Sequence, residues 1–84
     1  MKKQQFNRDV EGARDELERI GIETFDSNGR NLFGMLLEGT DHASYYATSD
    51  MSIIGSEELQ EIMRAYNMYW EWNNAEAASV YYAS

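Results

Sequence analysis

The dipeptide Asn28–Gly29 lies between two apolar segments and constrains the fold most strongly. Both residues tolerate a positive φ angle, so Asn-Gly is the preferred sequence of the two-residue type I′ turn that joins antiparallel strands. The spacing predicts a β-hairpin over residues 21–39. Its predicted strand pairs are Phe25 with Leu32, Thr24 with Phe33, and Ile22 with Met35.

The two faces of this hairpin follow from the alternation of side chains along a strand. One face carries large apolar residues that we expect to lie in the core: Ile22, Phe33, Met35 and Leu37. The opposite face carries Phe25, Leu32 and Leu36. Because a solvated face does not need that much apolar surface, these three residues form a candidate contact patch.

Apolar residues recur at helical spacing before the hairpin: Phe6, Val10, Ala13, Leu17 and Ile20. This stripe predicts an amphipathic helix. We expect Asn7 to cap its start. Gly21 is expected to end it in the left-handed conformation, with Ile22 folding back on Leu17. Gly12, inside the helix, indicates a close approach by another element.

Residues 43–49 are predicted to form a third strand, followed by a linker whose Ile53 and Ile54 fill the core. Ser56 is expected to cap a second helix. The buried stripe of that helix would comprise Leu59, Ile62, Met63, Tyr66, Tyr69 and Trp70. Asn73 is expected to end it, and Asn74 to cap a short last helix over residues 75–82.

The predicted fold is therefore α+β, a single domain over residues 1–84. It has a three-stranded antiparallel sheet with an N-terminal helix and two C-terminal helices, in the order α-β-β-β-α-α. The chain has no cysteine and a single histidine, so we expect neither a metal site nor a cofactor. It shows no signal-peptide pattern and no long apolar segment, which predicts a cytoplasmic protein.

The net charge of −8 is unevenly distributed. Residues 1–30 carry six Lys/Arg and seven Asp/Glu, whereas residues 31–84 carry one base, Arg64, against eight acids. A negative field of this kind repels nucleic acid and anionic membranes and attracts basic partners. We therefore expect a protein partner with a basic surface, and no direct contact with nucleic acid or membrane.

Catalytic patterns are weak in this sequence. His42 lies near Ser44, Ser49 and Ser52, but none of these serines occupies a nucleophile-elbow context, and we expect a solvated turn histidine. The glycines of the hairpin match no phosphate-binding loop. The sequence therefore predicts a protein that is not an enzyme.

Acidic and aromatic residues of the C-terminal half are the candidate partner-binding residues. Glu57 and Glu61 are four residues apart, roughly 6 Å on one helix face, which imitates the spacing of about 7 Å between phosphates of one nucleic-acid strand. Tyr66, Tyr69 and Trp70 are assigned to the core. The predicted partner-binding set is Glu57, Glu58, Glu61, Glu71, Glu76, Trp72, Tyr81 and Tyr82.

The predicted layout resembles the small, acidic, cysteine-poor anti-CRISPR proteins of phages and mobile elements. "FNRDVEGARDELERIG" corresponds to the first helix of a Cas9 inhibitor of that group, residues 22–49 to its three-stranded sheet, and "SEELQEIMRAYNMYWEWNNAEAASVYY" to its helical part. The resemblance implies a non-enzymatic inhibitor that occludes a basic nucleic-acid-binding surface. For a phage-encoded protein it implies the cytoplasm of the bacterial host.

Two other classes fit the same residues. Immunity proteins and antitoxins that neutralise basic nucleases are also small, acidic and rich in interface aromatic residues. A small homodimeric structural or interaction protein would bury its rings across a two-fold axis.

Overall fold

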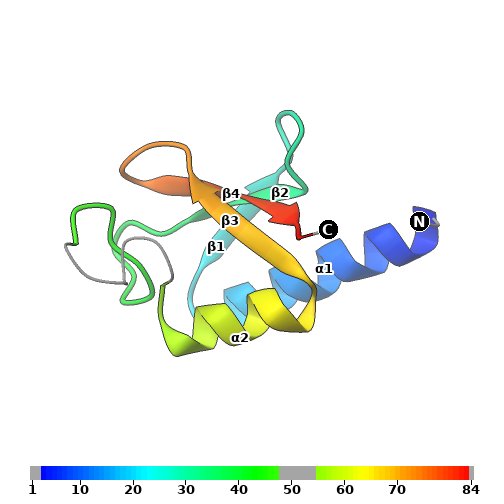
Figure 1. Cartoon of the computed structure of the whole chain (residues 1–84), viewed down its shortest axis with the longest axis horizontal. Coiled ribbons are helices and arrows are strands. Elements are labelled where there is room, and N and C mark those ends of the chain that lie inside the picture. Colours follow the sequence, from blue (N-terminus) through cyan, green and yellow to red (C-terminus); the bar gives the residue numbers. More distant parts are fainter. Residues whose placement is uncertain (1–2, 48–54, 84) are drawn as a thin grey trace.

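In the described part of the chain, two helices lie against one face of a four-stranded antiparallel sheet (Figure 1). This computed structural model describes residues 3–47 and 55–83. The elements in chain order are α1 (Lys3–Arg19), β1 (Glu23–Asp26), β2 (Phe33–Leu36), α2 (Glu57–Ala65), β3 (Met68–Trp72) and β4 (Ala77–Tyr82). The structure is α+β, but the predicted three-stranded sheet and α-β-β-β-α-α order are wrong.

The sheet is built from two hairpins. β1 pairs with β2 and β3 pairs with β4, and the antiparallel pairing of β2 with β4 joins the hairpins in the order β1-β2-β4-β3. The register places the side chains of Phe33 opposite Val80 and of Met35 opposite Ala78. These four side chains are fully buried beneath the helices and form the centre of the core.

The C-terminal end of α1 follows the prediction. Gly21 has a φ of 94°, the left-handed conformation in which a side chain would be strained. The Gly21 amide donates to the Glu18 carbonyl at 3.1 Å and the Ile22 amide to the Leu17 carbonyl at 3.0 Å. These two bonds define a Schellman motif. The predicted Asn7 cap is wrong, because the helix already begins at Lys3.

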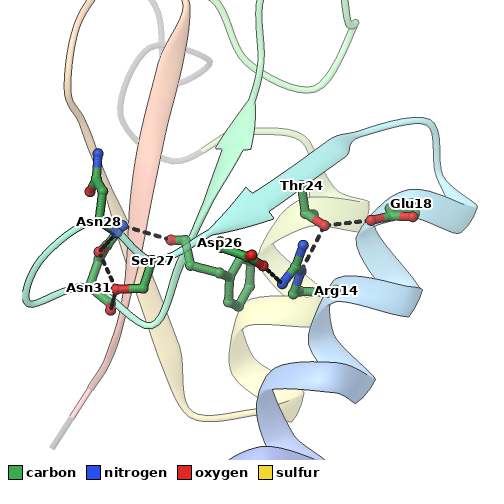
Figure 2. Close-up of polar contacts among 8 residues, drawn as sticks. Arg14, Glu18, Thr24, Asp26, Ser27, Asn28 and Asn31 are labelled. Atoms are coloured by element: carbon green, nitrogen blue, oxygen red, sulfur yellow. Dashed lines mark hydrogen bonds and ion pairs between the residues drawn. The ribbon is translucent and has the colours of Figure 1, made fainter.

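The first hairpin forms, but with a longer loop than Asn28–Gly29 predicts. Phe25 pairs with Gly34 and Thr24 with Met35, two residues away from the predicted register. The buried Asn31 side chain holds the longer loop by donating to the Phe33 carbonyl and to Ser79 Oγ, both at 3.1 Å. Figure 2 shows Asn31 with Ser27 and Asn28 in this loop. Ser27 Oγ donates to the Asn31 carbonyl at 2.7 Å.

The slip of two residues leaves each side chain on its predicted face, because side chains alternate with period two. The predicted core face is confirmed: Ile22, Phe33, Met35 and Leu37 are all 0% exposed. α1 and α2 contribute Ala13, Leu17, Leu59 and Met63 to the same core.

The first hairpin is also tied to α1 by Arg14. Its Nε donates to Thr24 Oγ1 and its guanidinium to Asp26 Oδ1, each at 2.9 Å (Figure 2). Thr24 in turn donates to Glu18. The Arg14 guanidinium also lies 6.0 Å from the centroid of the Phe33 ring. Arg14 therefore connects the helix to the edge strand and covers one side of the core.

Tyr66, the residue that follows α2, approaches α1 closely at Gly12, as predicted. A methyl group at Gly12 would lie 2.6 Å from the hydroxyl of Tyr66 and 3.0 Å from its ring. The absence of a side chain at Gly12 thus lets Tyr66 lie against α1.

The C-terminal third differs most from the prediction. α2 ends at Ala65, and Asn67, with a φ of 55°, is the residue that breaks it. The segment that was assigned to the end of this helix is β3, and the predicted last helix over residues 75–82 is β4. Asn74 Oδ1 accepts from the amides of Glu76 and Ala77 at 2.8 and 3.0 Å. The Asn74 side chain therefore makes hydrogen bonds of the kind that cap a helix, as predicted, but the element that follows it is the strand β4.

The predicted third strand is also wrong for its described part. Residues 43–47 contain a turn, in which the Ala47 amide donates to the Ser44 carbonyl at 3.2 Å. Residues 48 and 49, and the predicted core residues Ile53 and Ile54, lie outside the described part of the chain.

Candidate partner-binding surface

An acidic groove runs between α1 and α2 and has a volume of about 390 Å³. Its walls come from the facing sides of the two helices: Glu16, Arg19, Ile20, Glu58, Glu61, Ile62, Ala65 and Tyr66. The apolar floor continues the buried faces of both helices. We call this surface the acidic groove, together with the exposed Glu57 that precedes it on α2.

The charges of the acidic groove are unbalanced. Three carboxylates, those of Glu16, Glu58 and Glu61, share it with the single guanidinium of Arg19, which is paired with Glu16. Among the described residues, neither Glu57 nor Glu61 forms an ion pair. A concave site lined by charges of one sign concentrates the field and attracts ions of opposite sign.

The start of α2 explains how Glu57 and Glu58 are placed. Ser56 caps the helix, and its Oγ accepts from the Leu59 amide at 3.2 Å, as the sequence predicts. Acids in the first turn also complement the positive end of the helix dipole. Their positions are therefore compatible with stability alone, whereas Glu61 lies one turn further along.

His42 is a buried connector rather than the expected solvated histidine. It is 9% exposed, its Nε2 lies 2.9 Å from the Ile20 carbonyl and its Nδ1 lies 2.7 Å from Ser56 Oγ. Because a carbonyl only accepts, Nε2 carries the proton, and in the neutral ring the Ser56 hydroxyl donates to Nδ1. Both ring nitrogens and the hydroxyl thus serve structural bonds that join α1, the loop after β2 and α2.

The remaining predicted site residues do not join the acidic groove. Glu71 and Tyr81 lie on the outer face of the sheet, opposite the helices, and Glu76 is exposed in the loop between β3 and β4. Trp72 and Tyr82 lie on the inner face and pack against the core. The eight predicted residues therefore fall on at least three surfaces.

The outer face of the sheet carries Tyr69, which the sequence predicts to lie in the core. Tyr69 is 44% exposed and stacks on Tyr81, with ring centroids 5.3 Å apart. The assignment of Tyr69 to the core is wrong, because β3 turns it outward, while Tyr66 and Trp70 do pack against the core. Of the predicted contact patch, Phe25 and Leu36 lie on this outer face, where Leu36 is half-buried. Leu32, just before β2, is half-buried and packs against the core.

Tyr82 joins the end of β4 to α1. Its hydroxyl donates to Asp9 Oδ2 at 2.8 Å. Burial of the phenol, followed by this hydrogen bond and the negative charge of Asp9, raises the pKa of Tyr82 to about 12. The protonated phenol is the form that this contact requires.

Sequence reasoning missed Glu16 and Arg19 as groove residues, and also Tyr45 and Tyr46, which lie at the tip of the turn at residues 44–47. Glu16 lies beside the apolar stripe of α1, but its place in a groove depends on the packing of α2. The two adjacent tyrosines fall in the segment predicted as a third strand, whereas in the structure they lie in a turn.

Within residues 3–47 and 55–83, no three His, Asp or Glu side chains are grouped to hold a metal ion. In the same residues, no helix has the length and apolar character needed to cross a membrane. No protein-family model, curated protein or solved structure was found to match this chain.

Proposed function

We propose that this protein is a non-enzymatic inhibitor that occludes a basic, nucleic-acid-binding surface of a nuclease or defence complex, acting in a bacterial cytoplasm. The observation that carries the proposal is the acidic groove, in which carboxylates from two helices share one concave surface with a single guanidinium. Glu57 extends the negative surface along α2.

The chemistry of the acidic groove suits such a target. Glu57 and Glu61, four residues apart on α2, present charges roughly 6 Å apart. Phosphates along one strand are about 7 Å apart, so a protein surface that binds them has cations at comparable spacing. Carboxylates that lack internal cations keep their charge available for those of a partner.

The proposal rests on charge and shape, and not on element order. The resemblance to a Cas9 inhibitor was built on an α-β-β-β-α-α layout, which the structure does not have. What remains in support is the net charge of −8 and the grouping of acids around one groove. A CRISPR effector is therefore one member of a wider class of candidate targets.

A competition assay tests the proposal. Purified Cas9-type effectors and other basic nucleases are first loaded with fluorescently labelled duplex DNA, and the protein is then titrated in while anisotropy is recorded. The wild type should displace the DNA from at least one of them. Glu57→Lys/Glu61→Lys should weaken displacement more than about 100-fold, because like charges across an interface cost several kcal/mol.

Glu11 and Asp15 provide a matched control. They are also exposed and four residues apart, but they lie on α1 beside a different hollow, lined with Arg14 and Glu18. Glu11→Lys/Asp15→Lys changes the net charge by the same amount and should leave displacement nearly unchanged. Equal losses from both pairs would show that net charge acts diffusely. Failure to displace DNA from every tested enzyme would contradict the proposal.

A further inference from the structure

A second, smaller pocket of about 150 Å³ lies at the end of the sheet where β3 leads into its loop. Three of the side chains that line it are aromatic, those of Tyr45, Tyr46 and Trp72, and a fourth is the carboxylate of Glu38. We call it the aromatic pocket. It shares no residue with the acidic groove.

The rings of the aromatic pocket stand at right angles to one another. Tyr45 and Tyr46 have centroids 5.2 Å apart and an interplanar angle of 84°. Tyr45 and Trp72 have centroids 5.4 Å apart and an angle of 89°. In an edge-to-face pair one ring presents its edge to the face of the other, and the largely exposed ring of Tyr46 is open to a further contact. Tyr46 is 80% exposed, which gives it no role in the core.

The fold brings Tyr45 and Trp72 together before any ligand arrives. Tyr45 and Tyr46 occupy the two central positions of the turn closed by Ser44 and Ala47. Such positions favour small or polar residues, so two tyrosines are not explained by the turn itself. Ala43, just before the turn, is 4% exposed and anchors it to the core. On the other side, Trp72 packs edge-to-face on Trp70, with centroids 5.2 Å apart.

The charge around the aromatic pocket is negative. The Glu76 carbonyl accepts from the amides of Leu37 and Glu38, at 2.9 and 3.0 Å, so the exposed Glu76 lies beside Glu38. None of the described residues that line the pocket is lysine or arginine. An anion is therefore repelled here, and a cation is attracted both by carboxylate and by the negative faces of the rings.

We propose that the aromatic pocket binds one positively charged side chain, an arginine in the first instance, of a basic peptide segment in a partner protein. Its volume is below the 300–1,000 Å³ typical of pockets for drug-sized ligands, and so fits one side chain. A planar guanidinium stacks on aromatic faces while it donates to a carboxylate. In the aromatic pocket, Tyr45, Tyr46 and Trp72 supply the aromatic rings, and Glu38 supplies the carboxylate.

Peptide titration followed by NMR tests this inference without the partner of the acidic groove. The probes are blocked glycine pentapeptides with a central arginine, lysine or trimethyl-lysine, and their neutral counterparts with citrulline or norleucine. The arginine peptide should shift the indole resonance of Trp72 and the amides of Tyr45 and Glu38. It should bind at least about tenfold more tightly than the citrulline peptide, because cation–π attraction and the carboxylate both need the charge.

Variants of two pocket residues separate cation binding from simple apolar contact. Tyr46→Phe keeps the π face and should retain binding, whereas Tyr46→Leu keeps apolar volume and should lose most of it. Glu38→Gln should weaken binding of the arginine peptide, and Glu71→Gln, on the outer face of the sheet, should not. Tyr46 is exposed, so its variants should fold, which their NMR spectra verify directly.

Several outcomes would overturn the inference. They are norleucine binding as tightly as lysine, Tyr46→Leu binding as tightly as Tyr46→Phe, and no shift at Trp72 with any cationic peptide. If the trimethyl-lysine peptide bound more tightly than the arginine peptide, the ligand would be a methylated lysine. The inference that the pocket binds arginine would then be wrong. None of these results depends on whether the acidic groove inhibits a nuclease.

Discussion

Replacing Gly34 with alanine should destabilise the wild type but stabilise a variant that lacks the Phe25 ring. Gly34 lies in the central strand β2, directly opposite Phe25 of the edge strand β1. A methyl group at Gly34 would lie 2.0 Å from Cε2 and 2.4 Å from Cζ of Phe25. The ring therefore covers the glycine, and the two residues act as one unit.

The size of the effect follows from burial. Phe25 is 37% exposed, so about two thirds of its side chain is buried. Full burial of a phenylalanine stabilises by about 1.5–3 kcal/mol. The burial that depends on the position of the ring over Gly34 therefore contributes about 1–2 kcal/mol. Alanine in place of a strand glycine gains about 0.5–1 kcal/mol. Gly34→Ala should thus cost about 0.5–1 kcal/mol in the wild type and gain about 0.5–1 kcal/mol in Phe25→Ala.

Urea denaturation of the wild type, both single variants and the double variant measures this cycle. The slopes of the unfolding transitions should agree, so that midpoints report stability. The expected coupling free energy is about 1–2 kcal/mol. An effect of Gly34→Ala with the same sign and size in both backgrounds would refute the contact between ring and backbone.

Two further predictions concern Ser56 and Tyr82, the partly buried side chains that connect separate elements. Ser56→Ala should lower the free energy of unfolding by about 2–3 kcal/mol, because it removes the cap of α2 and leaves Nδ1 of His42 without its hydroxyl partner. Ser56→Thr keeps the hydroxyl and should lower the free energy of unfolding less. Equal losses for the two variants in urea denaturation would contradict the role of the hydroxyl. The raised pKa of Tyr82, about 12, means that the folded state holds the phenolic proton to higher pH than the unfolded state does. The stabilisation is thus complete below pH about 10 and is lost as the pH rises to about 12. The pH dependence of the melting temperature should be shallower over that range for Tyr82→Phe, and identical slopes would contradict the contact with Asp9.

Local signals in the sequence predicted the ends and faces of several elements. Gly21 sets the end of α1 through its own backbone conformation, and Ser56 caps α2 through a side chain three residues from its partner. The buried face of the first hairpin was also predictable, because side-chain alternation survives a slip of two residues. Each of these features depends only on residues that are close together in the sequence, so the sequence alone predicts it.

Features that depend on distant partners were not predictable in the same way. The Asn-Gly signal was overridden by the bond from Asn31 to Ser79, which is 48 residues away. The segment "MYWEW" fits a helical stripe or a strand equally well until β4 is known to pair with it. In the structure the burial of this segment alternates, as in a strand with one buried face. The Asn73–Asn74 that follows it is also typical of a turn.

The same distinction applies to the candidate site. The exposure of Glu57, Glu58 and Glu61 follows from the periodicity of one helix, and the structure bears it out. That Glu16 shares a groove with Glu58 depends on how α1 and α2 pack, and Gly12 and Tyr66 are in contact there. A site composed from two elements requires the tertiary structure, however clear each element is by itself.

The salt dependence of association tests the central claim most directly, that unpaired acids of the groove attract a basic surface. Stopped-flow or surface-based kinetics would follow binding to the enzyme most strongly inhibited in the competition assay, between about 50 and 200 mM salt. Exposed charges are screened over about 10 Å at 0.1 M, so the wild-type association rate should fall steeply. The association rate of Glu57→Lys/Glu61→Lys should fall less steeply with salt than that of the wild type. The association rate of Glu11→Lys/Asp15→Lys should fall as steeply as that of the wild type. An association rate that is independent of salt in the wild type would contradict the account.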